Sequence, residues 1–140
     1  MTNQIYPCLW FDGTAKAAAE FYCSVFKNSK ITSENPMVVI WELNGKKFMG
    51  LNGGPMFKPN EAVSFVIDCE TQEEIDYYWN KLTEDGAESQ CGWLKDKFGV
   101  SWQIVPTVLA KLMSDPEKSG RVMQAFMKMK KFDIGKLMEA

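Results

Sequence analysis

The chain contains an internal repeat, and this repeat constrains the fold more than any other feature. Phe11-Asp12 precedes a helix-like stretch that ends at Phe26, and Ile67-Asp68 precedes a similar stretch that ends at Leu82, 56 positions after Phe26. Each stretch has apolar residues at helical spacing and follows a short apolar segment typical of a strand. The repeat therefore predicts two βαβββ units within an α+β fold.

Turn and capping signals divide each copy into elements. Strands are predicted over residues 5–11, 37–43, 47–51, 62–68, 92–95 and 100–105, and helices over 15–26 and from 71 to about 83. Asn44-Gly45 is a strong hairpin signal. Thr14 is the expected N-cap of the first helix. Thr71, followed three residues later by Glu74, has the form of a capping box for the second helix.

Residues after Pro106 depart from the repeat. A short helix is predicted over 108–113, a second helix begins at Asp115-Pro116, and Asp133 caps a last turn. We expect one domain over 1–140, with the first repeat at about 4–55, the second at about 61–106 and a helical tail at about 107–140. The second tail helix carries an apolar stripe of Val122, Met123, Phe126 and Met127. This stripe either packs on the sheet or on a second subunit, or it lines a ligand groove.

The composition excludes several classes of protein. Hydrophobic residues make up 46% of the chain, which is ample for a core, and the net charge of −2 steers it toward neither nucleic acid nor anionic membrane. The lysines at 128, 130 and 131 fit a solvated helix face. No apolar stretch approaches the roughly 20 residues of a membrane span. The N-terminus lacks the pattern of a secretion signal, so we expect a cytoplasmic protein.

The four cysteines lie at 8, 23, 69 and 91, and the chain has no histidine. None of them forms a CxxC pair, so structural zinc is not expected. We expect the cysteines to be reduced thiols. Cys8 and Cys91 are the candidates for a nucleophile. A reactive thiolate needs a neighbouring base or cation, which only Lys95 or Lys97 could supply to Cys91. The favoured interpretation is that both are buried, inert thiols.

Several strings carry a resemblance to a known family. They are residues 7–13, 51–55, 69–79, 90–96 and 101–106. The chain resembles the vicinal oxygen chelate superfamily of glyoxalase I, bleomycin-resistance proteins and extradiol dioxygenases. Within it, the closest likeness is to the PhnB-like branch, often labelled 3-demethylubiquinone-9 3-methyltransferase. The resemblance implies that the two βαβββ units form a curved mixed sheet whose concave face holds a ligand, and that the protein forms a homodimer.

Strand alternation then sorts residues between the helix and the cleft. In the first strand Pro7, Leu9 and Phe11 are expected to face the helix, and Tyr6, Cys8 and Trp10 the cleft. The shift of 56 carries these three cleft positions onto Ala62, Ser64 and Val66. Aligning Pro55 with Pro106 gives a shift of 51 for the fourth strands and matches Asn52 with Gln103. The predicted cleft residues are Tyr6, Cys8, Trp10, Trp41, Asn52, Ser64 and Gln103. Trp79 and Trp102 are expected in the core.

Members of the superfamily that bind metal place His or Glu at four positions, which by this alignment hold Tyr6, Asn52, Ala62 and Gln103. These side chains do not offset the free energy that a divalent ion loses when it gives up its hydration shell, so we expect no metal and no other cofactor. A site made of carboxylates would have to recruit Glu42 or Glu61. Asn52 and Gln103 either orient a ligand or bond to each other or to nearby backbone. Ser64 is interpreted as a small packing residue.

The leading functional hypothesis is a protein that binds a small, partly apolar molecule in a metal-free cleft, to sequester or sense it. The alternatives are an enzyme of lyase, isomerase or dioxygenase type with a non-standard site, and a structural or regulatory dimer. No catalytic residue is assigned. The methyltransferase label has no support in the residues, because the only glycine cluster, 50–54, follows a hairpin strand and precedes no helix.

Overall fold

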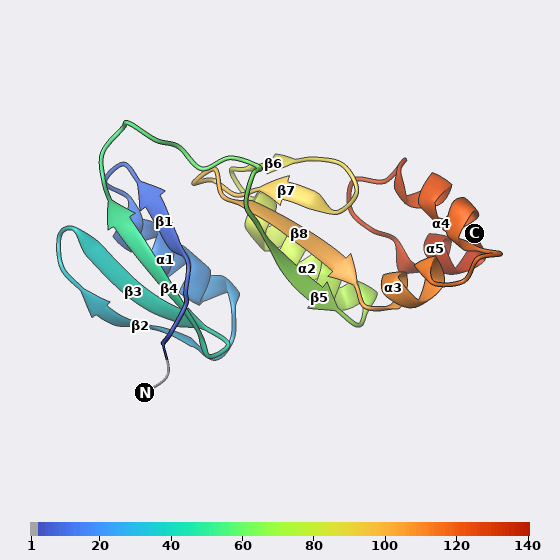
Figure 1. Ribbon diagram of the computed structural model, residues 1–140, viewed down its shortest axis with the longest axis horizontal. Helices are drawn as coiled ribbons and strands as arrows, with labels where there is room; N and C mark the ends of the chain where they lie inside the picture. Colours follow the sequence, from blue (N-terminus) through green and yellow to red (C-terminus); the bar gives the residue numbers. More distant parts are fainter. Residues whose placement is uncertain (1–2) are drawn as a thin grey trace. The chain divides into compact units, whose positions relative to one another are not determined.

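The computed structural model describes residues 3–140, which divide into two compact units. The first unit ends at Pro59 and the second begins at Asn60, so the boundary lies in the segment between the two copies of the repeat (Figure 1). Each copy forms its own four-stranded mixed sheet. The predicted α+β fold of paired βαβββ repeats followed by C-terminal helices is confirmed.

The first unit consists of β1 (Cys8–Phe11), α1 (Ala15–Val25), β2 (Ser29–Glu34), β3 (Val38–Leu43) and β4 (Lys46–Asn52). The strand order is β1-β4-β3-β2, in which β1 is parallel to β4 and the other pairs are antiparallel. Asn44-Gly45 forms the turn between β3 and β4, as predicted. The first strand is shorter than expected and begins at Cys8.

Helix α1 packs on one face of this sheet around a buried tryptophan. Trp41 in β3 is 0% exposed, and it stacks on Phe48 at a centroid distance of 5.8 Å and meets Tyr22 at 5.9 Å. A Cβ atom at Gly50 would lie 2.9 Å from the Trp41 ring and 3.2 Å from the Cβ of Ala15. Only glycine in β4 therefore allows the helix, the indole and the sheet to approach this closely.

The second unit consists of β5 (Ser64–Cys69), α2 (Gln72–Thr83), β6 (Ala87–Glu88), β7 (Trp93–Lys95), β8 (Ser101–Pro106), α3 (Val108–Met113), α4 (Ser119–Phe126) and α5 (Ile134–Glu139). The strand order is β5-β8-β7-β6, with β5 parallel to β8. Thr71 and Glu74 form the predicted capping box of α2. The first unit lacks this device, because the Thr14 side chain caps no N–H of α1.

Two tryptophans of the second unit lie in its core, as predicted. Trp79 on α2 and Trp102 on β8 are each 3% exposed. The Trp102 Nε1 group donates to Oδ2 of Asp96 at 2.9 Å, and Oδ1 of the same buried carboxylate accepts from the N–H groups of Phe98 and Val100. Asp96 thus holds the β7–β8 turn and the core indole together.

The C-terminal helices pack on the second unit. The Gln72 side chain donates to the Phe132 carbonyl at 2.9 Å and accepts from Ile134 N–H at 2.8 Å. Helix α4 begins at Ser119, later than predicted, because Asp115 and Pro116 lie in a preceding turn. Val122 is fully buried within the unit, whereas Met123 on the same helix is 44% exposed and Met127, which caps the C-terminus of α4, is 60% exposed.

Candidate functional site

Each sheet has one face covered by a helix and one open face. In the first unit Phe11, Trp41 and Gly50 face α1, so their strand neighbours point to the other side. We call this side the first open face; it carries Cys8, Trp10, Val38, Ile40, Glu42, Lys47, Met49 and Leu51. In the second unit the buried residues Leu94, Trp102 and Ile104 lie on the helix-covered side. The second open face carries Ser64, Val66, Asp68, Trp93, Lys95, Ser101, Gln103 and Val105.

The side chains of the second open face form two rows across β7, β8 and β5. Ser101 pairs with Lys95 on one side and with Ser64 on the other. In the next row, Gln103 pairs with Trp93 and with Val66. Side chains in such rows lie about 5 Å apart at their Cβ atoms, close enough to act on one ligand.

Gln103 and Ser64, both predicted in the cleft, are brought together on this face. The Gln103 Nε2 group donates to the Ser64 hydroxyl oxygen at 2.9 Å, which links β8 to β5. Both side chains are half-buried. The bond uses one amide hydrogen and leaves the Gln103 carbonyl oxygen without a hydrogen-bond donor among residues 3–140. Ser64 is therefore more than a packing residue, because it orients the amide.

Trp10 lies on the first open face, in agreement with the predicted alternation. Its Nε1 group donates to the Gly54 carbonyl at 2.8 Å, and Phe57 meets its ring edge-on at 5.0 Å. A side chain at Gly53 would collide with the indole. The loop after β4 therefore closes over Trp10 and holds its orientation.

The other two predicted residues of the first strand lie beside Trp10 in sequence but differ in environment. Tyr6 precedes β1 and is half-buried, with the Lys47 ammonium 4.0 Å from its ring centroid. Cys8 on β1 is exposed, which corrects the expectation that it is buried. Desolvation nonetheless raises the pKa of the Cys8 thiol, so it stays protonated at neutral pH. This thiol is a poor nucleophile.

Cys91 is also less buried than expected. It is half-buried and adopts a positive φ of 58°, and its N–H donates to the Met129 carbonyl at 2.8 Å. The Lys95 ammonium pairs with the Glu61 carboxylate, and the Lys97 ammonium lies 5.8 Å from the Phe98 ring centroid. The two candidate cations therefore have partners other than Cys91.

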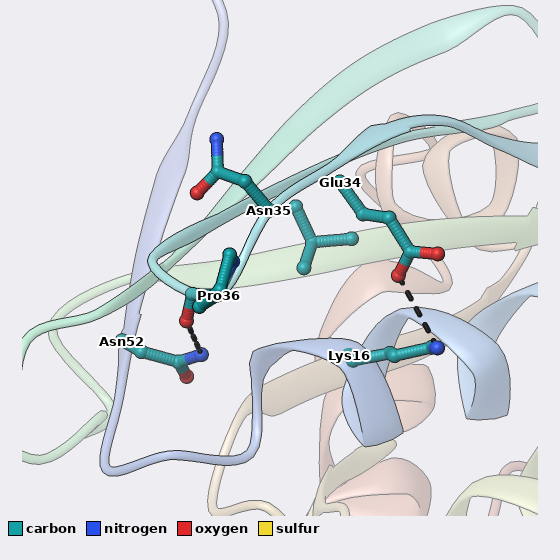
Figure 2. A pocket seen from close by; sticks show the side chains of 6 residues that line it. Lys16, Glu34, Asn35, Pro36 and Asn52 are labelled. Carbon is teal, nitrogen blue, oxygen red and sulfur yellow. Dashed lines mark hydrogen bonds and ion pairs between the residues drawn. The ribbon is translucent and has the colours of Figure 1, made fainter.

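Asn52 does not lie on the open face, and its predicted place in the cleft is wrong. Its Oδ1 accepts from Ala15 N–H at 2.9 Å, at the first residue of α1, and its Nδ2 donates to the Pro36 carbonyl at 3.0 Å. This side chain lines a pocket of about 310 Å³. Figure 2 shows it across the pocket from an ion pair between Lys16 and Glu34. Asn52 caps α1 in place of Thr14 and belongs to the scaffold.

The error in Asn52 comes from the alignment of the fourth strands. Phe11 pairs with Asn52, and its counterpart Ile67 pairs one residue beyond Gln103. The fourth strands therefore correspond at a shift of 52 rather than 51, and the counterpart of Gln103 is Leu51. A shift of one residue moves a side chain to the opposite face of a sheet.

The proline alignment failed because the two prolines hold different positions. Pro106 is the last residue of β8, whereas β4 ends at Asn52 and Pro55 lies in the following loop. By contrast, the shift of 56 between the first strands is confirmed, because Phe11 and Ile67 both point toward a helix.

Trp41 is also not a cleft residue, because it lies wholly in the core beneath α1. The tryptophan that sequence reasoning missed is Trp93, which is half-buried on the second open face beside Gln103. Alternation within 93–95 could have found it, since buried Leu94 must point opposite to both of its neighbours.

The sequence matches a known protein family over most of its length. The family model described as 3-demethylubiquinone-9 3-methyltransferase matches residues 3–105. The chain belongs to this family. The PhnB protein from Bacillus cereus is 34% identical, and the match covers 75% of this chain and 100% of that one with a TM-score of 0.68. No curated protein matches the chain.

More distant structures share the fold of this PhnB family. A glyoxalase-related enzyme from Fulvimarina pelagi is 15% identical, with coverage of 77% of this chain and 91% of that one and a TM-score of 0.56. The fosfomycin resistance protein FosX from Listeria monocytogenes, a complex with Mn(II) and sulfate, is 11% identical, with coverage of 81% and 98% and a TM-score of 0.58. The fold is that of the vicinal oxygen chelate superfamily.

The fold raises the question of a metal, and the residues of this PhnB-family protein do not fit one. With the corrected alignment, the candidate ligand positions hold Tyr6, Leu51, Ala62 and Gln103, which offer a phenol, an amide and two apolar groups. Among residues 3–140, no three His, Cys, Asp or Glu side chains gather closely enough to hold a metal ion. Of the two carboxylates considered for a metal site, Glu61 pairs with Lys95, and Glu42 lies in β3 opposite Lys47 of β4.

None of the helices within residues 3–140 is both long enough and apolar enough to cross a membrane.

The donor set predicts that the purified protein carries no stoichiometric metal. Elemental analysis after purification without chelators should find neither Zn, Ni, Mn nor Fe at one ion per chain, and EDTA should leave the melting temperature unchanged. One tightly held ion per chain would contradict this reading of the site.

The contacts of Asn52 predict that it supports stability and not ligand binding. Replacing Asn52 by Ala removes the cap on Ala15 and the bond to Pro36, which should lower the free energy of unfolding by about 1–3 kcal/mol. Asn52→Asp keeps the acceptor at the helix N-terminus and should be milder. Denaturant titrations measure both, and an unchanged stability in Asn52→Ala would refute the scaffold role.

Proposed function

We propose that this protein binds a small, partly apolar molecule on the second open face. The observation that carries the proposal is the Gln103–Ser64 hydrogen bond, which fixes an amide on an exposed sheet surface with its carbonyl oxygen available. Trp93 supplies an aromatic surface in the same row, and Val66, which is 55% exposed, supplies an apolar one. A few fixed polar groups among apolar walls are typical of small-molecule sites.

Binding fits the chain better than methyl transfer, the activity in the description of the family. A methyl donor such as S-adenosylmethionine is normally held by a glycine-rich turn between a strand and a helix. Here Gly50 and Gly53 make room for the indoles of Trp41 and Trp10, and the next element after β4 is the strand β5. These glycines have packing reasons and need no cofactor to explain them.

An enzyme with a non-standard site would need an activated nucleophile or base on an open face. The Cys8 thiol is the exposed nucleophilic group of the first open face, and its raised pKa keeps it in the unreactive form. The second open face offers amide, hydroxyl and ammonium groups, which orient a ligand well, and the exposed carboxylate of Asp68 near the end of β5. Binding without reaction is therefore the function that these side chains support best.

Replacing Gln103 by Leu tests the proposal. The change keeps most of the volume and removes both hydrogen-bonding groups, so the affinity for a ligand found by a thermal-shift screen should fall by about 1–3 kcal/mol, roughly 5- to 150-fold. The melting temperature should change little, because the amide is only half-buried.

Ser64→Ala is the matched control for this variant. It removes the group that orients the Gln103 amide and leaves the amide itself, so it should weaken binding less than Gln103→Leu. If Gln103→Leu lowers stability while affinity stays normal, then Gln103 is part of the scaffold and the binding face is elsewhere.

We also propose that the protein is a homodimer, with α4 at the contact. Val122 is used within its own unit, and Phe126 meets Phe132 at 5.9 Å, so Met123 and Met127 are what the apolar stripe offers to a partner. Light scattering should give twice the chain mass at micromolar concentration, and Met127→Lys should shift it toward the monomer. A single chain mass in the wild type would rule out the dimer.

A further inference from the structure

Ser101 has a buried side chain whose hydroxyl is unpaired within the part of the chain that the structure describes. It is 1% exposed, and its Oγ atom has no hydrogen-bond partner among residues 3–140. A buried hydroxyl without a partner is unfavourable, and such groups are rare in native proteins. Ser101 lines a pocket of about 260 Å³ in the second unit, together with Glu61, Trp93 and Lys95. Ser101 therefore borders a concave site and carries a hydroxyl that no described group uses.

Lys95 is the nearest charged neighbour of Ser101 in the sheet. The two residues pair across β7 and β8 on the second open face, which places their Cβ atoms about 5 Å apart. The Lys95 ammonium forms an ion pair with the carboxylate of Glu61, a residue that precedes β5. Because β8 lies between β7 and β5, this ion pair spans the start of β8 at Ser101.

The ion pair is easily exchanged. The side chains of Lys95 and Glu61 are 42% and 61% exposed, so water and salt compete with the contact. Lys95 also holds the pKa of Glu61 below its usual range, so this carboxylate is ionised at neutral pH. Although Glu61 satisfies Lys95, it leaves the Ser101 hydroxyl unpaired. A carboxylate that reached both groups would fit the pocket better than Glu61 does.

We propose that Lys95 and Ser101 form a carboxylate-binding corner, which Glu61 occupies in the free protein and which a ligand carboxylate takes over. The inference rests on the proposed function, because it names the ligand class of the same open face. Lys95 supplies the charge, Ser101 donates the hydrogen bond that Glu61 leaves unmade, and Trp93 contacts the apolar body of the ligand. The ligand is thus an aromatic or apolar carboxylic acid.

Removal of the Glu61 charge should have opposite effects on an anionic ligand and on a cationic one. Glu88 also lines the pocket, so with Glu61 in place the carboxylates outnumber the single ammonium of Lys95. An anion must therefore displace Glu61, and loss of the Glu61 charge should help it bind. A cation would be held by Glu61, and loss of that charge should weaken it.

Three probes of similar shape and different charge test the corner: benzoate, benzamide and benzylammonium. Titrations of the full chain followed by ¹H–¹⁵N NMR give affinities and locate binding through the amides of Lys95, Ser101 and Gln103. Benzoate should bind more tightly than both other probes. Glu61→Gln should tighten benzoate by up to about 5-fold, the range of an exposed ion pair.

Lys95→Met and Ser101→Ala should each weaken benzoate by about 10-fold or more, as expected for a hydrogen bond to a charged group. Lys97→Met and Glu84→Gln, which change exposed charges of the second unit outside this pocket, serve as controls and should have no such effect. Ser101→Ala should also keep or raise the melting temperature, because it removes an unsatisfied buried hydroxyl. If Ser101 has only a structural role, Ser101→Ala should lower the melting temperature and leave benzoate affinity unchanged.

Three outcomes would overturn the corner: equal affinities for benzoate and benzamide, preferred binding of benzylammonium that Glu61→Gln weakens, or no shift at these amides with any probe. Benzamide binding that depends on Gln103 would leave the proposed function standing and remove only the carboxylate specificity. Benzoate binding that depends on Lys95 but not on Gln103 would support the corner and remove the proposed role of Gln103.

Discussion

The packing of a tryptophan between sheet and helix decides the rest of each unit. Trp41 lies beneath α1, and Trp102 lies on the helix-covered side of the second sheet, where Asp96 binds its indole. Once such a side chain points inward, alternation sends its strand neighbours to the open face. Because Trp102 must point into the core, its neighbours Ser101 and Gln103 point to the open face. The core tryptophan thus determines which residues a ligand on that face can meet.

The two units use this arrangement differently. The first open face is largely apolar, with the Cys8 thiol, the Glu42–Lys47 cross-strand pair, and Trp10 held by the loop that follows β4. The second carries an amide, two hydroxyls and an ammonium near Trp93, and the carboxylate of Asp68 near the end of β5. The same supersecondary unit thus presents two chemistries after duplication, which agrees with a superfamily whose fold alone does not determine a reaction. The polar groups that could orient a ligand are concentrated in the second unit.

Sequence reasoning succeeded where a local signal is strong and failed where it depended on register. The capping box at Thr71, the Asn44-Gly45 turn and the repeat at a shift of 56 each rest on short-range chemistry, and all are present in the structure. Asn52 was misplaced because one residue of error in a strand reverses its face. Trp41 looked like a wall because aromatic residues suit both cores and pockets, and only the close approach at Gly50 distinguishes the two.

The C-terminal helices show that the unit of homology and the unit of folding differ in this chain. The family model ends at residue 105, before the first of these helices. Yet the N–H groups of Cys91 and Gly92 donate to the carbonyls of Met129 and Lys130, and Gln72 on α2 is bonded at both ends of its amide to the same segment. A protein cut at the homology boundary would leave these backbone groups to water. In this chain, the second repeat relies for several of its hydrogen bonds on a C-terminal segment that the family model does not include.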